Sequence, residues 1–197
     1  MGRGNHFLGY SVEKGCSKTP LIPHKDRPRQ VYVLAKLLSY FYHPAYVLFE
    51  AGGQQKKPKD LDFYTRSSRE HNITFFGQMS RRGATDDMVW PKGIAQFPSL
   101  SKSDFHRFIA SSLVTLGVGQ PLISPSPYES LCLGVPFINP IATWDKKDPM
   151  NRDKWQGQAD GLIVYGIDEP YVYHVHQGDI QALNRALVKA INTPIEK

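Results

Sequence analysis

The sequence predicts an α/β domain built on a mostly parallel β-sheet. Four short apolar runs have the composition of buried strands, and they lie at residues 30–36, 73–77, 113–116 and 135–138. Three segments carry helix-start signals or apolar residues at helical spacing, and they lie at residues 101–109, 128–133 and 179–191. Strands and helices that alternate along one chain are typical of parallel strands joined by crossover helices.

Residues 113–140 are the unit around which the chain is organised. A short apolar run ends at Gly117, and a loop rich in Gly, Pro and Ser follows it. A short helical segment then ends at Gly134, directly before the next apolar run. This order predicts a βαβ unit with a crossover helix of minimal length. Its first loop lies at the carboxyl end of the predicted sheet, where open α/β folds bind ligands.

The composition of this loop is suited to a phosphate group. Gly117 and Gly119 allow a ligand to approach the backbone closely. The helix start would present the N–H groups of Ser126, Tyr128 and Glu129 to an anion, and the Glu129 carboxylate could accept hydrogen bonds from a ribose diol. The alternative is a surface loop in which Glu129 only complements the helix dipole.

One pattern in this segment resembles a known family. A Gly-x-Gly follows the strand, then come Pro-x-Pro-x-Glu, a helix ended by Gly, and an apolar strand ending in Asn-Pro; these are residues 117–119, 125–129, 134 and 137–140. The pattern resembles the donor-site segment of the family 18 glycosyltransferases, the α-1,6-mannosylglycoprotein 6-β-N-acetylglucosaminyltransferases. The resemblance implies the second domain of a GT-B glycosyltransferase, a Rossmann-like domain that holds most of the nucleotide sugar.

The resemblance also implies an activity. The donor would be UDP-N-acetylglucosamine and the acceptor a mannose of a glycoprotein N-glycan, giving a β-1,6 branch with inversion at the anomeric carbon. No cofactor and no metal ion would be required. The catalytic base of the family is a glutamate of the first domain, so we expect it in an upstream domain that this sequence does not contain. Location in the Golgi lumen would follow, with a type II membrane anchor upstream.

Two further residues enter the predicted donor site through the resemblance. Residues 32–41 resemble the family segment whose lysine neutralises the donor pyrophosphate, which gives Lys36 that role as a point charge. The alternative is a lysine whose stem covers apolar surface at a strand end. Residues 90–94 resemble the loop that lies against the uracil, so we expect Ile94 to contact the base.

The resemblance divides the chain into two parts. Residues 1–29 would be an interdomain strand, at residues 7–13, followed by a linker remnant, and residues 30–197 the donor-binding domain. Residues 42–71 depart from the family, because its long amphipathic helix is replaced here by a short apolar run and a polar, Gly- and Lys-rich stretch.

Composition narrows the partners. The 197 residues carry a formal charge of +6 and are 41% hydrophobic, as in ordinary globular domains. No apolar run is long enough to span a membrane, so we expect no membrane contact from this segment itself. The basic balance suits a diphosphate, and without an RNA-binding or zinc-finger pattern we expect no nucleic acid. Cys132 is predicted to be a buried small side chain, whereas Cys16 lies in a loop and could pair with another segment. Asn72 begins a glycosylation sequon that overlaps a predicted strand, so its occupancy is doubtful.

The carboxyl-terminal part offers fewer signals. Residues 144–155 form a mixed-charge loop flanked by tryptophans, for which a solvated mobile loop is favoured over an acceptor-side or lid role. Residues 170–176 alternate as a strand, which places His174 and His176 on one face without a third metal ligand nearby. Asp179 is expected to cap the final helix.

Two rival functions remain open. One is a non-catalytic module that binds a sugar nucleotide, and the other is a Rossmann-like protein that binds a different phosphorylated ligand.

Overall fold

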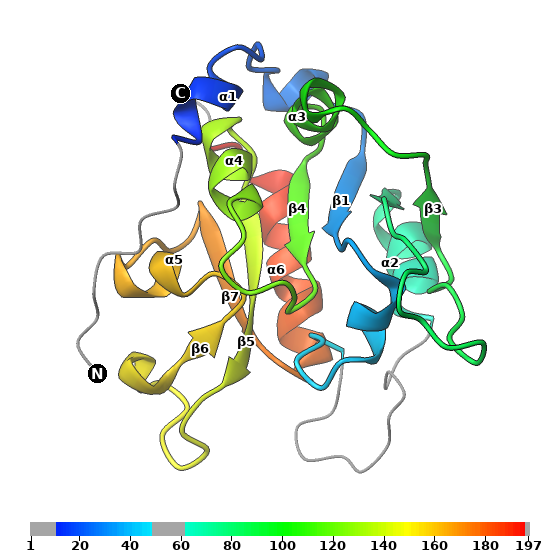
Figure 1. The fold of residues 1–197 in the computed structure, drawn as a ribbon. Coiled ribbons are helices and arrows are strands. Elements are labelled where there is room, and N and C mark those ends of the chain that lie inside the picture. Colours follow the sequence, from blue (N-terminus) through cyan, green and yellow to red (C-terminus); the bar gives the residue numbers. More distant parts are fainter. Residues whose placement is uncertain (1–10, 49–61, 196–197) are drawn as a thin grey trace.

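The computed structural model describes residues 11–48 and 62–195. Within them it confirms an α/β domain on a mainly parallel sheet, with the strand order β3-β2-β1-β4-β5-β6 and with β7 paired to β5 (Figure 1). The strands are β1 (Gln30–Leu34), β2 (Thr74–Gly77), β3 (Ile94–Gln96), β4 (Val114–Gly117), β5 (Phe137–Thr143), β6 (Gln156–Gly157) and β7 (Val172–His176). Every described pairing is parallel except that of β5 with β6.

Helices cover both faces of this sheet. The α-helices are α1 (Glu13–Cys16), α2 (Phe63–His71), α3 (Lys102–Ala110), α4 (Ser126–Cys132), α5 (Asp160–Val164) and α6 (Ile180–Asn192). Short 3-10 turns are η1 (His24–Asp26), η2 (Leu38–Tyr42) and η3 (Arg152–Lys154). In Figure 1, α6 lies on the face of the sheet opposite to α3 and α4.

Alternate strand residues feed two separate cores. Val31 and Val33 of β1 belong to the core beneath α6, together with Leu183 and Leu187. Tyr32 of β1 belongs instead to the core beneath α3 and α4. This division follows from the two-residue period of a strand, which sends successive side chains to opposite faces.

The helix caps predicted from sequence are confirmed. The Ser101 hydroxyl accepts a hydrogen bond from the Asp104 N–H at 3.1 Å and starts α3. The Asp179 carboxylate accepts one from the Ala182 N–H at 2.8 Å and starts α6. Each cap satisfies a backbone donor that the first helical turn leaves without a partner.

The segment before β1 is fastened to the sheet domain. Of the strand expected at residues 7–13 only residues 11–13 are described, and Glu13 begins α1 rather than continuing a strand. Arg27 is buried, and its guanidinium donates to the carbonyls of Ile22, Ser112 and Gly134. The described residues before β1 are therefore held against the domain and do not form a free linker.

The prediction for Cys132 is wrong. Cys132 is exposed at the end of α4 and forms a disulfide with the buried Cys16 of α1, with 6.2 Å between the two Cα atoms. The two cysteines are 116 positions apart in sequence, so composition alone could not pair them. The bond joins the amino-terminal segment to the helix that carries Glu129.

The region that departs from the family contributes to the core. Tyr46, Val47 and Leu48 are buried, and the Tyr46 and Tyr64 hydroxyl groups are 2.8 Å apart. The polar stretch expected to be a solvated loop lies within residues 49–61, outside the described part of the chain.

Candidate functional site

The predicted βαβ unit is formed by β4, α4 and β5. All four residues of β4 are buried, and β4 pairs with β5 through Thr115 and Leu116. The Ser130 hydroxyl, on the buried side of α4, donates to the Thr115 hydroxyl at 2.8 Å. This bond fixes α4 against β4, so the helix start lies beside the loop that follows the strand.

The two glycines of this loop are required by packing inside the protein. A Cβ atom on Gly117 would lie 2.5 Å from the Gln158 side-chain oxygen. Gly119 has a φ of +97°, and a Cβ atom there would overlap the carbonyl oxygen of Ala45. Close approach of a ligand is therefore not needed to explain either glycine.

The expectation of free N–H groups at the start of α4 is wrong. The Ser126 N–H donates to the Ser124 hydroxyl at 3.3 Å. The N–H groups of Tyr128 and Glu129 both donate to the Pro125 carbonyl, each at 3.0 Å. In this arrangement the loop satisfies its own donors, so these groups do not form a prepared phosphate cradle.

Glu129 occupies an unusual position for a carboxylate. It is 3% exposed, and its Oε1 atom lies 3.3 Å from the His106 Nε2 atom and 3.5 Å from the Lys102 ammonium. His106 is as deeply buried as Glu129. Among the described residues both contacts fall on Oε1, and no partner of Oε2 is found. Glu129 therefore keeps one oxygen for a further hydrogen bond.

The other predicted donor residues lie at different points of the sheet. Leu34 pairs with Gly117, and the exposed Lys36 follows two residues beyond Leu34, so Lys36 and the β4–α4 loop lie at the same edge. Ile94 lies on β3, two strands from β1, where its side chain is 8% exposed and belongs to the core beneath α6. A uracil contact by the Ile94 side chain would require that side chain to leave the core, whereas its backbone is not restricted in this way.

Sequence reasoning missed a large cavity on the other side of α4. Its volume is about 940 Å³, and its walls are the β4–α4 loop, the start of α4, the segment from β5 to β6, and α5. Of the predicted donor residues only Tyr128 lines it. The Tyr128 hydroxyl points toward Gly161 of α5, and burial together with the nearby Tyr165 and Asp160 raises the pKa of this phenol. Tyr128 is therefore a neutral hydrogen-bond donor at physiological pH.

The loop at residues 144–155 is anchored, contrary to the expectation of a mobile loop. Arg152 binds both carboxylate oxygens of Asp168, each at 2.8 Å. The Trp155 indole N–H donates to the Pro149 carbonyl at 2.8 Å, and the Trp144 ring stacks on the His176 ring at 4.5 Å. These contacts hold the loop as one wall of the cavity.

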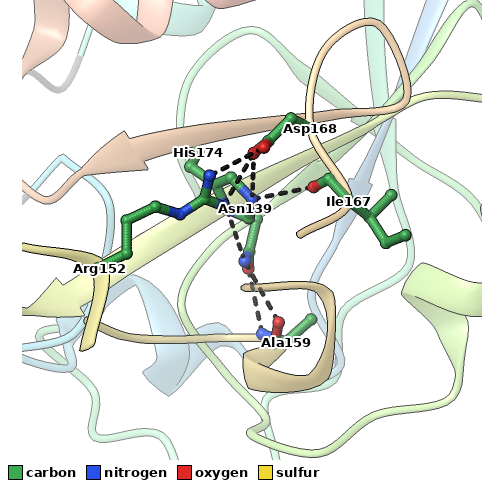
Figure 2. A network of polar contacts seen from close by, with 6 residues as sticks. All are labelled: Asn139, Arg152, Ala159, Ile167, Asp168 and His174. Carbon is green, nitrogen blue, oxygen red and sulfur yellow. Dashed lines mark hydrogen bonds and ion pairs between the residues drawn. The ribbon is translucent and has the colours of Figure 1, made fainter. Parts of the chain in front are cut away.

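A polar network behind this wall connects it to the sheet (Figure 2). The His174 Nε2 atom lies 3.1 Å from the Ile167 carbonyl and 3.5 Å from Asp168, and its Nδ1 atom lies 3.2 Å from the Asn139 amide. The fully buried Asn139 accepts a hydrogen bond from the Ala159 N–H at 3.1 Å, at the start of α5. Burial lowers the pKa of His174 despite the nearby carboxylate, so the imidazole is neutral near pH 7.

Two absences concern the described residues alone. No group of three or more His, Cys, Asp or Glu side chains within residues 11–48 and 62–195 could hold a metal ion. In the same residues, no helix has the length and apolar character of a membrane span.

Comparisons with known proteins give a fold and no family. No protein-family model matches the sequence, and no characterised protein matches it in sequence. Among solved structures, it is similar to a Methanocaldococcus jannaschii UDP-GlcNAc 2-epimerase in complex with UDP-GlcNAc and UDP, with a TM-score of 0.51, 10% identity, and coverage of 88% of this chain and 43% of that one. It is also similar to a protein assigned as a UDP-N-acetylglucosamine 2-epimerase from Listeria monocytogenes, with a TM-score of 0.50, 11% identity, and coverage of 98% and 40%.

These likenesses confirm the fold class. The chain is a Rossmann-like α/β domain of the GT-B type, and it spans about two fifths of the length of each of these two neighbours. At this low identity the likeness concerns the fold alone, so the resemblance to family 18 and the roles of individual residues stay predictions.

Proposed function

We propose that this chain binds a UDP-sugar and is the donor-binding domain of an inverting glycosyltransferase that uses UDP-N-acetylglucosamine. The observation that carries the proposal is Glu129, a nearly fully buried carboxylate in the family-like Pro-x-Pro-x-Glu segment that follows β4. Burial of a carboxylate is costly, and a position needed only for packing is more easily filled by an apolar side chain. A carboxylate with one oxygen held by His106 and the other unpartnered among the described residues is suited to a ribose diol.

The remaining donor contacts are part of the same proposal. Lys36 supplies positive charge to the diphosphate at the edge where β1 and β4 end. No metal ion is needed if Lys36 and neighbouring donors stabilise the leaving UDP. In the transfer, the acceptor hydroxyl oxygen bonds to C1 of the sugar as the C1–O bond to UDP breaks. The electron pair leaves with UDP, and a base takes the hydroxyl proton.

The finer assignment follows from the family resemblance. The acceptor is a mannose of a glycoprotein N-glycan, the product a β-1,6 branch, and the compartment the Golgi lumen. The disulfide between Cys16 and Cys132 supports an oxidising compartment, because structural disulfides are rare in the cytosol. The catalytic base belongs to another domain, so we expect this chain alone to bind donor without transferring sugar. Turnover by the 197-residue chain, with UDP-N-acetylglucosamine and a mannosyl acceptor, would place the base within these residues.

Calorimetry with UDP tests the donor proposal. The variant Glu129→Gln should weaken UDP binding by about 1–3 kcal/mol, the cost of a lost charge-assisted hydrogen bond. The matched control is Glu169→Gln, because Glu169 is an exposed glutamate paired with Lys189, and this variant should leave UDP binding unchanged. Thermal unfolding of both variants verifies that each still folds.

A second ligand makes the test specific for the ribose. 2′,3′-Dideoxy-UDP lacks the diol, so the wild type should bind it as weakly as Glu129→Gln binds UDP, and Glu129→Gln should cause no further loss. Equal UDP affinity in the wild type and Glu129→Gln would remove Glu129 from the ribose role. Absence of UDP binding by the folded wild type would overturn the proposed function.

A further inference from the structure

We propose that the cavity beside α5 is a binding site for a neutral carbohydrate chain, separate from the predicted UDP site. This goes beyond the proposed function, because it assigns a ligand class to a surface that the donor residues do not form. Lys36, Ile94, Gly117, Gly119, Ser126 and Glu129 are all absent from the lining of the cavity. Tyr128 is shared only nominally, since its predicted donor contact is a backbone N–H and its side chain faces α5.

The cavity has the size and the apolar surface that a sugar requires. A volume of about 940 Å³ is at the upper end of the usual range for small-ligand sites. Tyr165 and Ile123 are each 66% exposed at its edge, and Trp155 is only partly buried in its wall. A pyranose ring presents an apolar C–H face that packs on such aromatic and aliphatic surfaces.

The backbone at Ile123 is also unusual. Ile123 has a φ of +55°, a conformation that is rare for a β-branched residue. Side chains held in such conformations cluster at ligand sites, where the surrounding structure enforces them. Here the conformation keeps a large apolar side chain in solvent at the mouth of the cavity.

The charges of the lining favour hydroxyl groups over phosphate. The carboxylates of Asp145, Asp153 and Asp160 line the cavity, against the cations of Lys154 and Arg152. Arg152 is neutralised by its two hydrogen bonds to Asp168, so the surplus charge is negative. Anions are repelled by such a surface, whereas sugar hydroxyl groups donate to it.

Two of these carboxylates are already oriented. The Oδ1 atom of Asp160 accepts a hydrogen bond from the Gly157 N–H at 2.6 Å, and the Oδ1 atom of Asp145 accepts one from the Lys147 N–H at 2.8 Å. Each carboxylate keeps its second oxygen for a ligand, as far as the described residues show. The neutral Tyr128 phenol adds a donor in the opposite wall.

The walls are connected through the sheet, so the site is largely preformed. The network of Figure 2 joins Arg152 in one wall to Ala159 at the start of α5 in the other, through Asp168, His174 and Asn139. A preformed site loses less conformational entropy when a ligand binds.

NMR titration tests the proposal, because the chain has three tryptophans and their indole N–H signals are few enough to assign. The probes are α-1,6-mannobiose and methyl α-mannoside. We expect the Trp155 signal to shift in a saturable way at millimolar saccharide and the Trp90 signal to stay constant, since Trp90 does not line the cavity. A titration without any saturable shift of Trp155 would overturn the proposal.

The matched variants are Tyr165→Ala and Tyr171→Ala, which remove two exposed tyrosines, one at the cavity and one outside it. Tyr165→Ala should weaken saccharide binding about threefold to tenfold, the usual effect of a lost aromatic contact. Tyr171→Ala should have no effect, and Tyr165→Ala should bind UDP as the wild type does. Equal saccharide affinity in all three proteins would overturn the assignment of the cavity.

Two competitors distinguish the remaining explanations. Displacement of the saccharide by UDP would place it in the donor site and overturn the claim of a separate site. Binding of a tetralysine peptide in its place would show that the acidic lining selects cations. Saccharide binding without UDP binding would remove only the donor proposal, and the reverse would remove only the proposal for this cavity.

Discussion

The bond between Cys16 and Cys132 should supply a large share of the stability of this domain. It closes a loop over 116 positions, and the loop-entropy relation gives about 5 kcal/mol at 25 °C for a loop of that length. Measured values for native disulfides are usually lower, about 2–4 kcal/mol. Domains of ordinary size unfold with about 5–15 kcal/mol in total, so the loss of this bond should be plainly visible.

The cleanest perturbation is reduction of the wild-type protein, since it breaks the bond and keeps both thiols. Cys132 is exposed, which gives a reductant access to the bond. Urea unfolding of the oxidised and reduced proteins should show a fall of about 2–5 kcal/mol in the free energy of unfolding. The double variant Cys16→Ser/Cys132→Ser should lose somewhat more, because Cys16 is buried and a serine hydroxyl there lacks an assured partner.

Two results would refute this reasoning. Mass spectrometry under denaturing, non-reducing conditions should find no free thiol, so alkylation of both cysteines would show that the bond is absent. A change of less than about 1 kcal/mol on reduction would show that the loop between the cysteines is already restricted in the unfolded chain.

Three further predictions concern the site and its supports. EDTA should leave the UDP affinity unchanged, and restoration of lost binding by manganese would contradict the charge role of Lys36. Gly119→Ala should destabilise the domain by more than the roughly 1–2 kcal/mol expected from a left-handed backbone alone. Gly166→Ala is its control, because Gly166 has a positive φ without any atom within 4 Å of a Cβ, whereas Gly119 contacts Ala45. A cost for Gly119→Ala equal to that of Gly166→Ala would show that the overlap is relieved. Stability should fall as the pH drops below 6.5, because burial lowers the pKa of His174 and the unfolded chain then binds more protons. Urea unfolding at pH values above and below 6.5 measures this slope, and His174→Gln should reduce it.

The order of elements could be predicted from sequence because its signals are local. The apolar runs that became β1, β2, β4 and β5, and the caps at Ser101 and Asp179, each depend on a few consecutive residues. The βαβ unit around α4 was predictable for the same reason, since its crossover is short.

The chemistry of the predicted site was harder to predict because it depends on long-range contacts. Gly119 is typical of a ligand loop in sequence, yet the chain segment that approaches it contains Ala45. Nothing near Glu129 in sequence announces His106, which comes from another helix. The cavity beside α5 combines four separate elements, so no single stretch of sequence could indicate it.

The buried Arg27 sets a lower limit on how far this chain can be shortened. A truncated protein that begins at Gln30 would lose the disulfide together with the guanidinium that joins the carbonyls of Ser112 and Gly134. Those two carbonyls precede β4 and β5, so their loss of a donor would loosen the entry to both strands of the βαβ unit. A minimal version of the domain therefore has to begin before Cys16, although the sheet itself starts at Gln30.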